Sequence, residues 1–230
     1  MWYNNYMVQY RKDKLVNGEY YHIFSRSIAK YVIFNNDKEY LRMLDSINLL
    51  RFIDFDYKMS KFNELKIQKQ NEIINILKTN NKTFTDIVAY CIMPTHIHLI
   101  LKQNIDNGIT KYMAKLLNSY AKYFNTKHKR KGHLWTDRFK SVLITNNEQI
   151  LHLTRYIHLN PVSAKLVRSP KKWQYSSFFE YINPDKNNIC TYKNIFDLKT
   201  EEYEKFVLNR IDYQQKLSLI KNLIIDEYSG

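Results

Sequence analysis

The 230-residue sequence predicts an α+β protein in which antiparallel strands alternate with helices. Short runs rich in aromatic and β-branched residues, typical of strands, alternate with longer segments whose apolar residues recur at helical spacing. Two of the short runs are separated only by Pro94 and Thr95, a gap that favours a β-hairpin. These two observations together indicate a mixed sheet-and-helix architecture.

The elements follow one another in the order β-α-β-β-α-β-α. The predicted strands cover residues 18–28, 84–93, 96–103 and 133–144, and the predicted helices cover 35–53, 108–130 and 146–160. We expect the last of these helices to end at Pro161, because proline lacks an amide donor. This order is typical of a ferredoxin-like antiparallel sheet that carries one further helix.

Two segments lie outside this pattern. Residues 54–82 are rich in Lys, Asn and Gln, and we interpret them as a helical insertion. Residues from about 185 onward look helical, and acidic residues outnumber basic ones over 201–230. We therefore predict one main domain at 1–183 and a helical C-terminal extension at 184–230.

The composition favours a polyanionic partner. Lys and Arg outnumber Asp and Glu by 36 to 22, which gives a formal net charge of +14. Such an excess points to nucleic acid first and to a membrane surface second. No apolar run approaches the roughly 20 residues that span a bilayer, and the N-terminus lacks the apolar stretch of a signal peptide. With two distant cysteines and no C-x-x-C, we expect a cytoplasmic protein with reduced thiols and no membrane partner.

More than half of the excess charge lies in one segment. Residues 111–140 contain nine Lys or Arg residues and one acid, Asp137. A solvated basic face would explain this, but interleaved aromatic residues favour a groove for single-stranded nucleic acid, where cations meet phosphates and rings stack on bases. The candidates for phosphate contacts are Lys127, Lys129, Arg130, Lys131, Arg138 and Lys140, and the candidates for base stacking are Trp135 and Phe139.

Two histidines stand one residue apart in the predicted strand at 96–103. Because side chains on a strand alternate between faces, His96 and His98 should share a face, about 7 Å apart along the strand. Two imidazoles at that spacing can converge on one metal ion. The alternative is one histidine bonded inside the sheet and one at its rim.

The helix at 146–160 offers a second pair of polar side chains. Tyr156 and Asn160 are four residues apart, and so they lie on one helical face beside the apolar stripe. A side chain there can pack its ring on the core while its tip faces a cleft. An ordinary half-buried tyrosine is the plain alternative, since the chain has 19 tyrosines.

Four motifs, in this order and spacing, resemble the transposases of the IS200 type. They are "MPTHIHLILK", "GHLWTDRFKS", "LTRYIHLNPVSAKLV" and "WQYSSFFEY", and the resemblance covers roughly residues 18–182. It is closest to the REP-associated tyrosine transposases, a branch of the HUH single-strand nucleases. Residues 54–82 and the chain after 185 have no counterpart that we can place.

The resemblance implies a function and a set of site residues. His96 and His98 would bind a divalent metal, Mg²⁺ or Mn²⁺, and Tyr156 would attack a single-stranded DNA phosphate to form a 5′-phosphotyrosine bond. Asn160 stands where the family has a polar residue that helps to hold the metal; other members carry Gln there. The DNA partner would be a hairpin or repeat sequence, and the protein a monomer or a homodimer.

Three other functions remain open at this point. A domesticated DNA-binding protein would share the basic groove but would not transfer strands. A 2H-type RNA phosphodiesterase needs two H-x-[ST] motifs, of which the sequence supplies only His152-Leu153-Thr154. The last alternative is a basic scaffold protein of a larger assembly.

Overall fold

The computed structural model describes residues 14–184, 189–196 and 198–209. Within these residues, four strands form one antiparallel sheet in the order β2-β3-β1-β4. The strands are β1 (Tyr20–Arg26), β2 (Thr85–Met93), β3 (His96–Gln103) and β4 (Lys140–Ile144). The predicted α+β class and the ferredoxin-like strand order are confirmed.

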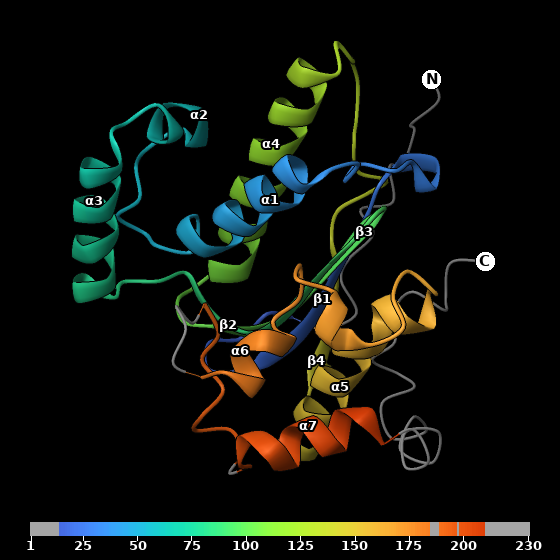
Figure 1. Ribbon diagram of the computed structural model, residues 1–230. Helices are drawn as coiled ribbons and strands as arrows, with labels where there is room; N and C mark the ends of the chain where they lie inside the picture. Colours follow the sequence, from blue (N-terminus) through green and yellow to red (C-terminus); the bar gives the residue numbers. More distant parts are fainter. Residues whose placement is uncertain (1–13, 185–188, 197, 210–230) are drawn as a thin grey trace, which may run out of the picture.

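Helices cover both faces of the sheet (Figure 1). On one face, α1 and α4 lie side by side, and on the other lie α5, α6 and α7. The described helices are α1 (Asp37–Leu49), α2 (Met59–Asn63), α3 (Ile67–Asn80), α4 (Gly108–Lys127), α5 (Asn147–Ser163), α6 (Phe178–Ile182) and α7 (Thr200–Leu208), with short 3₁₀ turns at Ile28–Lys30 and Pro170–Lys172. Residues 54–82, predicted to be a helical insertion, contain α2 and α3, which stand to one side of α1; that the segment is an insertion stays a prediction. None of these helices is long and apolar enough to cross a membrane.

Two expected boundaries were wrong. The fourth strand begins only at Lys140. Before it, the chain meets the end of β1 only through an isolated bridge between Trp135 and Ser27 and a hydrogen bond from the N–H of Thr136 to the carbonyl of Arg26, so regular pairing starts late. Helix α5 does not end at Pro161 but continues to Ser163. Proline has no N–H to donate, but the last turn still forms, because the N–H of Ala164 donates to the carbonyl of Asn160 at 2.9 Å. The predicted helix in the C-terminal extension is present as α7, and residues 210–230 lie outside the described part.

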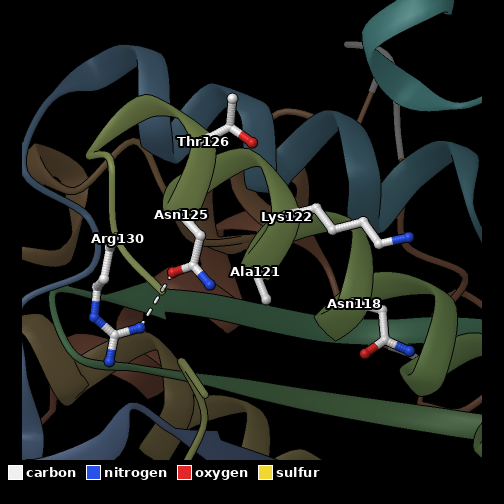
Figure 2. A pocket seen from close by; sticks show the side chains of 6 residues that line it. All are labelled: Asn118, Ala121, Lys122, Asn125, Thr126 and Arg130. Atoms are coloured by element: carbon white, nitrogen blue, oxygen red, sulfur yellow. Dashed lines mark hydrogen bonds between the residues drawn. The ribbon is translucent and has the colours of Figure 1, made fainter. Parts of the chain in front are cut away.

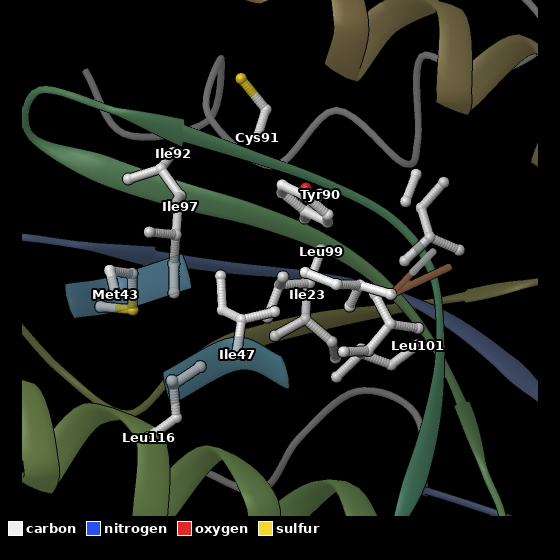
Figure 3. Close-up of a cluster of buried hydrophobic side chains, with 14 of the residues drawn as sticks. Ile23, Met43, Ile47, Tyr90, Cys91, Ile92, Ile97, Leu99, Leu101 and Leu116 are labelled. Carbon is white, nitrogen blue, oxygen red and sulfur yellow. The ribbon is translucent and has the colours of Figure 1, made fainter. Parts of the chain in front are cut away.

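The main core lies between the sheet and the helices α1 and α4. Ile23 of β1 and Leu99 of β3 are register partners on this face, and both are fully buried. Figure 3 shows Met43 and Ile47 of α1 and Leu116 of α4 facing them. Each such side chain contributes roughly 1.5–3 kcal/mol when it leaves water.

Residues 173–177 run alongside β2 and hydrogen-bond with its outer edge. The N–H of Ile92 donates to the carbonyl of Tyr175, and the N–H of Ser177 donates to the carbonyl of Tyr90, both at 2.9 Å. These bonds satisfy backbone groups that the sheet alone would leave open.

The described part of the C-terminal extension packs against α5 through a buried polar network. The hydroxyl of Tyr203 lies 2.7 Å from Nδ1 of His158 and donates to Oγ1 of Thr154 at 2.9 Å. On the other side of the ring, Nε2 of His158 lies 2.8 Å from Oγ of Ser177. Burial lowers the pKa of His158 to about 3, so its ring is neutral and has one donor and one acceptor for these partners. The boundary at 183/184 stays a prediction, but α7 evidently helps to hold α5 in place.

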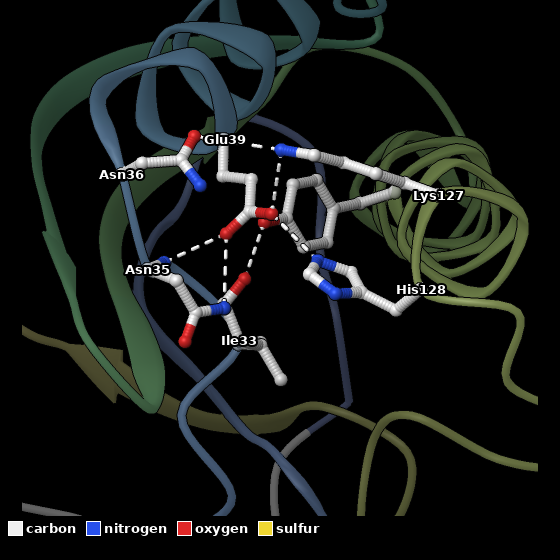
Figure 4. A network of polar contacts seen from close by, with 7 residues as sticks. Ile33, Asn35, Asn36, Glu39, Lys127 and His128 are labelled. Carbon is white, nitrogen blue, oxygen red and sulfur yellow. Dashed lines mark hydrogen bonds and ion pairs between the residues drawn. The ribbon is translucent and has the colours of Figure 1, made fainter.

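A buried carboxylate joins α1 to the end of α4 (Figure 4). Glu39 is fully buried and accepts hydrogen bonds from Nζ of Lys127 at 2.8 Å, from Nε2 of His128 at 2.7 Å and from the backbone N–H of Asn35 at 2.7 Å. Burial raises the pKa of Glu39, but these hydrogen bonds outweigh burial and bring the pKa down to about 2. The carboxylate is therefore charged at neutral pH and fixes the end of α4.

We expect Glu39→Gln to destabilise the fold at neutral pH, because Lys127 and His128 lose their charged partner. The loss should be on the order of 1–3 kcal/mol, the range for a buried polar group deprived of its partner. The folded pKa of Glu39 lies below its ordinary value, so its contribution is present above about pH 4.5 and is lost as the pH falls toward about 2. The free energies of unfolding of Glu39→Gln and of the parent protein, measured with urea, should therefore become equal as the pH is lowered.

The control is Glu64→Gln, which removes a surface ion pair with Lys61 whose side chains are 63% and 70% exposed. That change should leave the free energy of unfolding nearly unaltered, since exposed pairs contribute little. Two outcomes would contradict the role given to Glu39. One is an equal loss of unfolding free energy in Glu39→Gln and Glu64→Gln. The other is a loss in Glu39→Gln that does not change with pH.

Candidate active site and nucleic-acid interface

The two histidines of β3 lie on the same sheet face, as the alternation of side chains predicts. The ring centroids of His96 and His98 are 5.0 Å apart, and the rings are nearly perpendicular. Both rings contact Phe24 of β1, which is the register partner of His98, at centroid distances of 5.4 and 4.9 Å. His98 is fully buried and His96 is half-buried, so the pair reaches from the interior of the sheet to its surface.

Each histidine has a hydrogen-bond partner at its Nδ1 atom. Nδ1 of His98 lies 3.1 Å from Nε2 of His22 on β1, and the two rings stack with centroids 5.3 Å apart. Nδ1 of His96 lies 2.9 Å from Oγ1 of Thr95 in the hairpin turn. Partners of this kind fix the orientation of metal-binding imidazoles. Nε2 is then the ring nitrogen of each that would coordinate a metal.

His22 was not among the site residues predicted from the sequence. A histidine within the predicted strand at 18–28 was the available signal, but the sequence does not tell which residue it meets across the sheet. In the structure His22 is fully buried beside His98.

Burial lowers the pKa of His98 well below its ordinary range, and the neighbouring His96 and His22 lower it further. The ring is therefore neutral at physiological pH. A neutral imidazole is the form that binds metal ions.

The helix α5 places Tyr156 beside this histidine pair. The rings of Tyr156 and His98 are perpendicular, with centroids 6.0 Å apart, and Tyr156 is 8% exposed. The structure thus brings together three of the predicted site residues, His96, His98 and Tyr156, from two elements far apart in sequence.

Asn160 lies one helical turn beyond Tyr156 on α5. It is buried, and its Nδ2 atom has no hydrogen-bond partner among the described residues. A buried amide normally has partners, so this group is suited to a ligand that is not part of the chain. The side-chain carbonyl would be the metal-binding atom and Nδ2 would be a donor to the bound molecule.

The residues fit a divalent metal with nitrogen ligands. His96 and His98 offer two imidazoles and Asn160 an amide oxygen, whereas no group of three or more His, Cys, Asp or Glu side chains suited to a metal ion occurs in the described ranges. Imidazole ligands suit Mn²⁺ better than the oxygen-preferring Mg²⁺. This donor set therefore favours Mn²⁺.

The predicted basic residues at the end of α4 and in the turn after it fall into two groups. Lys127 is paired with Glu39, and Arg130 holds the turn by donating to Oδ1 of Asn125 at 3.1 Å (Figure 2) and to the carbonyl of His133 at 2.7 Å. Lys129 and Lys131 are exposed. Of the four, these two are the cations best presented to a phosphate backbone.

The two predicted stacking residues are less accessible than expected. Phe139 is 7% exposed and belongs to the core, so the interpretation of its ring as a platform for a base is not supported. Trp135 is half-buried, and its indole N–H donates to the carbonyl of Leu117 at 3.0 Å, which leaves only part of the ring to a ligand. Arg138 and Lys140, in contrast, are exposed and line a cavity of about 280 Å³ together with Phe24. Phe24, the register partner of Lys140, also contacts both imidazoles.

Part of the chain matches a known protein family. Residues 55–160 match the model of the family described as "Transposase IS200 like". A curated protein of Haemophilus influenzae strain Rd, named as a candidate REP-associated tyrosine transposase, is 32% identical over an alignment of 105 positions that covers 40% of this chain and 58% of that protein. The chain thus spans less than two thirds of the length of this relative.

A solved structure gives the same fold. It is described as a REP-associated tyrosine transposase bound to a REP hairpin, and it has a TM-score of 0.54 at 17% identity, covering 84% of this chain and 96% of the other. The matched range 55–160 includes His96, His98, Tyr156 and Asn160. The chain is thus similar to the IS200-like transposases over residues 55–160 and to a REP-associated tyrosine transposase in sequence and in fold.

Proposed function

We propose that the protein is a metal-dependent tyrosine transposase that nicks and joins single-stranded DNA through a 5′-phosphotyrosine bond. One observation carries the proposal: the ring centroid of Tyr156 lies 6.0 Å from that of His98, one of the two histidines of the pair. A nucleophile and metal-binding imidazoles at one place are what in-line attack on a phosphate needs.

The reaction is a transesterification. The phenolic oxygen of Tyr156 loses its proton and bonds to the phosphorus, and the bond from phosphorus to the 3′ oxygen breaks. That oxygen takes up a proton and becomes a free 3′-hydroxyl. Attack by a 3′-hydroxyl on the phosphotyrosine reverses the step and restores the tyrosine, so that joining needs no ATP.

The residues of the chain have separate parts in this proposal. His96, His98 and Asn160 would hold Mg²⁺ or Mn²⁺, which when bound neutralises negative charge on the phosphate. A free phenol has a pKa near 10 and is a weak nucleophile at neutral pH. Packing of α5 against β2 and β3 orients Tyr156, and the exposed cations Arg138, Lys140, Lys129 and Lys131 would hold the DNA backbone.

A single-stranded hairpin is the proposed substrate. The net charge of +14 supports a nucleic acid, and the solved relative is described as bound to a REP hairpin. A DNA-binding protein without strand transfer would share the cations, and the experiments below separate the two functions.

The first prediction concerns the metal. His98→Ala should abolish Mn²⁺ binding, because it removes one of the two imidazoles. His22→Gln should weaken binding by about tenfold to a hundredfold, since it disturbs only the group that orients His98. Isothermal titration of Mn²⁺ into each variant measures this, and thermal melting shows whether each is folded.

His133→Ala, which removes an exposed histidine, is the matched control and should bind Mn²⁺ like the parent protein. Unchanged Mn²⁺ affinity in folded His98→Ala would show that the metal site has been placed on the wrong residues.

The second prediction concerns the nucleophile. Tyr156→Phe removes only a hydroxyl, so DNA and Mn²⁺ should still bind while the covalent adduct disappears. The protein is incubated with Mn²⁺ and a labelled single-stranded hairpin, denatured, and analysed by gel and by mass spectrometry of the digest.

Tyr123→Phe, on α4, is the control and should form the adduct normally. An adduct that persists in Tyr156→Phe would identify another nucleophile. Absence of any adduct in the parent protein with Mn²⁺ or Mg²⁺, with tight DNA binding, would favour a binding protein without strand transfer.

The third prediction concerns salt. Affinity for the hairpin's single-stranded arm should fall with salt, at a log–log slope of about −0.7 per phosphate contact. The double variant Lys129→Ala, Lys131→Ala should flatten this slope by about 1.4, the value for two lost contacts.

Lys127 is left unchanged in this experiment because it is bonded to Glu39. The control is Lys61→Ala with Lys69→Ala, which removes two exposed lysines of α2 and α3 that pair with glutamates. If the control flattens the slope as much as the test variant, the DNA contacts do not centre on the turn after α4.

A further inference from the structure

Two parts of the proposed DNA-binding surface belong to different sides of the sheet. The histidine pair faces α5, since the ring of His98 lies beside that of Tyr156. Lys129 and Lys131 follow α4, which packs on the opposite face of the sheet (Figure 1). A DNA strand that contacts both the histidine pair and these lysines has to pass around the end of the sheet. The residues exposed at that end are therefore candidates for contact with the strand.

The segment at residues 28–32 lies at this end of the sheet. It directly follows β1 and Ser27, whose N–H donates to the carbonyl of Thr95 at 2.8 Å. The side chain of Thr95 in turn contacts Nδ1 of His96 at 2.9 Å. The segment is thus joined, through the hairpin turn, to the outer histidine of the pair.

The other side of the segment reaches the end of α4. The ring of Tyr31 meets that of Phe124 edge to face, with centroids 6.1 Å apart. Phe124 also contacts the ring of His128, at a centroid distance of 4.2 Å, and Lys129 is the next residue of the chain. The segment at 28–32 therefore lies between the histidine pair and the lysines of the turn after α4.

The backbone of this segment is held in an uncommon conformation. Ala29 and Lys30 have φ angles of 49° and 54°, in the left-handed region that residues with a β-carbon rarely adopt. The N–H of Tyr31 donates to the carbonyl of Ile28 at 2.9 Å, and the N–H of Ile28 donates to the carbonyl of Leu134 at 2.9 Å. Strained backbone that the surrounding structure holds in place often occurs at ligand-binding sites.

The side chains of the segment are all exposed. Tyr31 is 52% exposed, Val32 43% and Ile28 39%, so an aromatic ring and two branched side chains together present an apolar surface to solvent. Apolar side chains that gather at one exposed place usually mark a binding site, whereas single ones do not.

The charges around this apolar surface identify its occupant. Residues 26–34 contain two cations, Arg26 and Lys30, and no acid, and residues 129–136 contain three cations and no acid. An apolar surface surrounded by cations alone suits single-stranded DNA, in which bases stack on rings while phosphates meet positive charges. A surface for another protein would need only the apolar part.

We propose that Tyr31 is a stacking platform for one base of the DNA strand, where the strand passes around the end of the sheet. Ile28 and Val32 extend the apolar surface beside the ring, and Lys30 meets a neighbouring phosphate. This inference rests on the proposed function, because it takes the histidine pair and the turn after α4 as places that the strand contacts. It gives Tyr31 the role that the buried ring of Phe139 cannot perform.

The test measures binding alone, so that it does not depend on cleavage. Fluorescence anisotropy with EDTA present gives the affinity for a labelled DNA hairpin that carries a single-stranded arm. Tyr31→Ala should weaken binding by about tenfold, within the range for the loss of one stacked base. The slope of affinity against salt should not change, because no phosphate contact is lost. Tyr31→Phe keeps the ring and should bind like the parent protein.

A second variant and a control guard against a general loss of structure. Tyr31→Leu keeps an apolar contact with Phe124 but has no aromatic ring, and it should weaken binding as much as Tyr31→Ala. Thermal melting shows whether each variant is folded. The matched control is Tyr57→Ala, which removes a tyrosine that is 42% exposed just before α2 and should leave the affinity unchanged.

Hairpins with one abasic position each then locate the stacked base. One position in the arm should weaken binding to the parent protein by about tenfold, within the range for one stacked base. The same position should have no effect in Tyr31→Ala, because the contact is already absent. Abasic effects that are the same in Tyr31→Ala as in the parent protein would overturn the platform.

The other outcomes separate this inference from the proposed function. Unchanged affinity in folded Tyr31→Ala, or an equal loss in Tyr31→Phe, would overturn the platform even if the Tyr156 adduct forms. Unchanged DNA affinity together with a smaller assembly in sedimentation would assign the surface to a second copy of the chain, which also overturns the platform. A loss of affinity at constant salt slope, restored by Tyr31→Phe, would uphold the platform even if no adduct forms and the transfer reaction fails.

Discussion

The pairing register between β1 and β3 is the constraint on which the candidate site depends. It sets Phe24 opposite His98 and brings His22 to the same face, where its ring stacks on that of His98. A slip of one residue would turn His22 and Phe24 toward α1 and α4 and would place Ile23 among the imidazoles. The register is strongly specified, because the opposite face of the same strands forms the main apolar core.

Much of this arrangement was open to prediction from sequence. Runs rich in aromatic and β-branched residues predicted the four strands, and the alternation of side chains along a strand placed His96 and His98 on one face. Local patterns do not say what lies across the sheet, which is why His22 was missed. They also did not reveal the irregular pairing before Lys140 or the burial of Phe139. Metal ligation and DNA contacts stay predictions.

Not every basic residue counted in the sequence is available to bind a phosphate. Lys127 belongs to the most basic stretch, yet its ammonium is used by Glu39, which is 88 residues earlier in the chain. Arg130 is similarly occupied in shaping its own turn. Of the six predicted phosphate contacts, four are not engaged in this way and lie on exposed segments: Lys129, Lys131, Arg138 and Lys140. A net-charge argument thus identifies the class of partner better than it identifies the contacting residues.

The strip of chain at 173–177 has a consequence for how the molecule behaves when shortened. It occupies the free hydrogen-bonding groups of β2, and the residues that supply it come after the matched range 55–160. A fragment that ended at residue 160 would leave the outer edge of β2, a long apolar strand, exposed to solvent. Such strands recruit strands from other molecules and promote aggregation. By covering the edge of β2, residues 173–177 therefore prevent it from pairing with strands of other molecules.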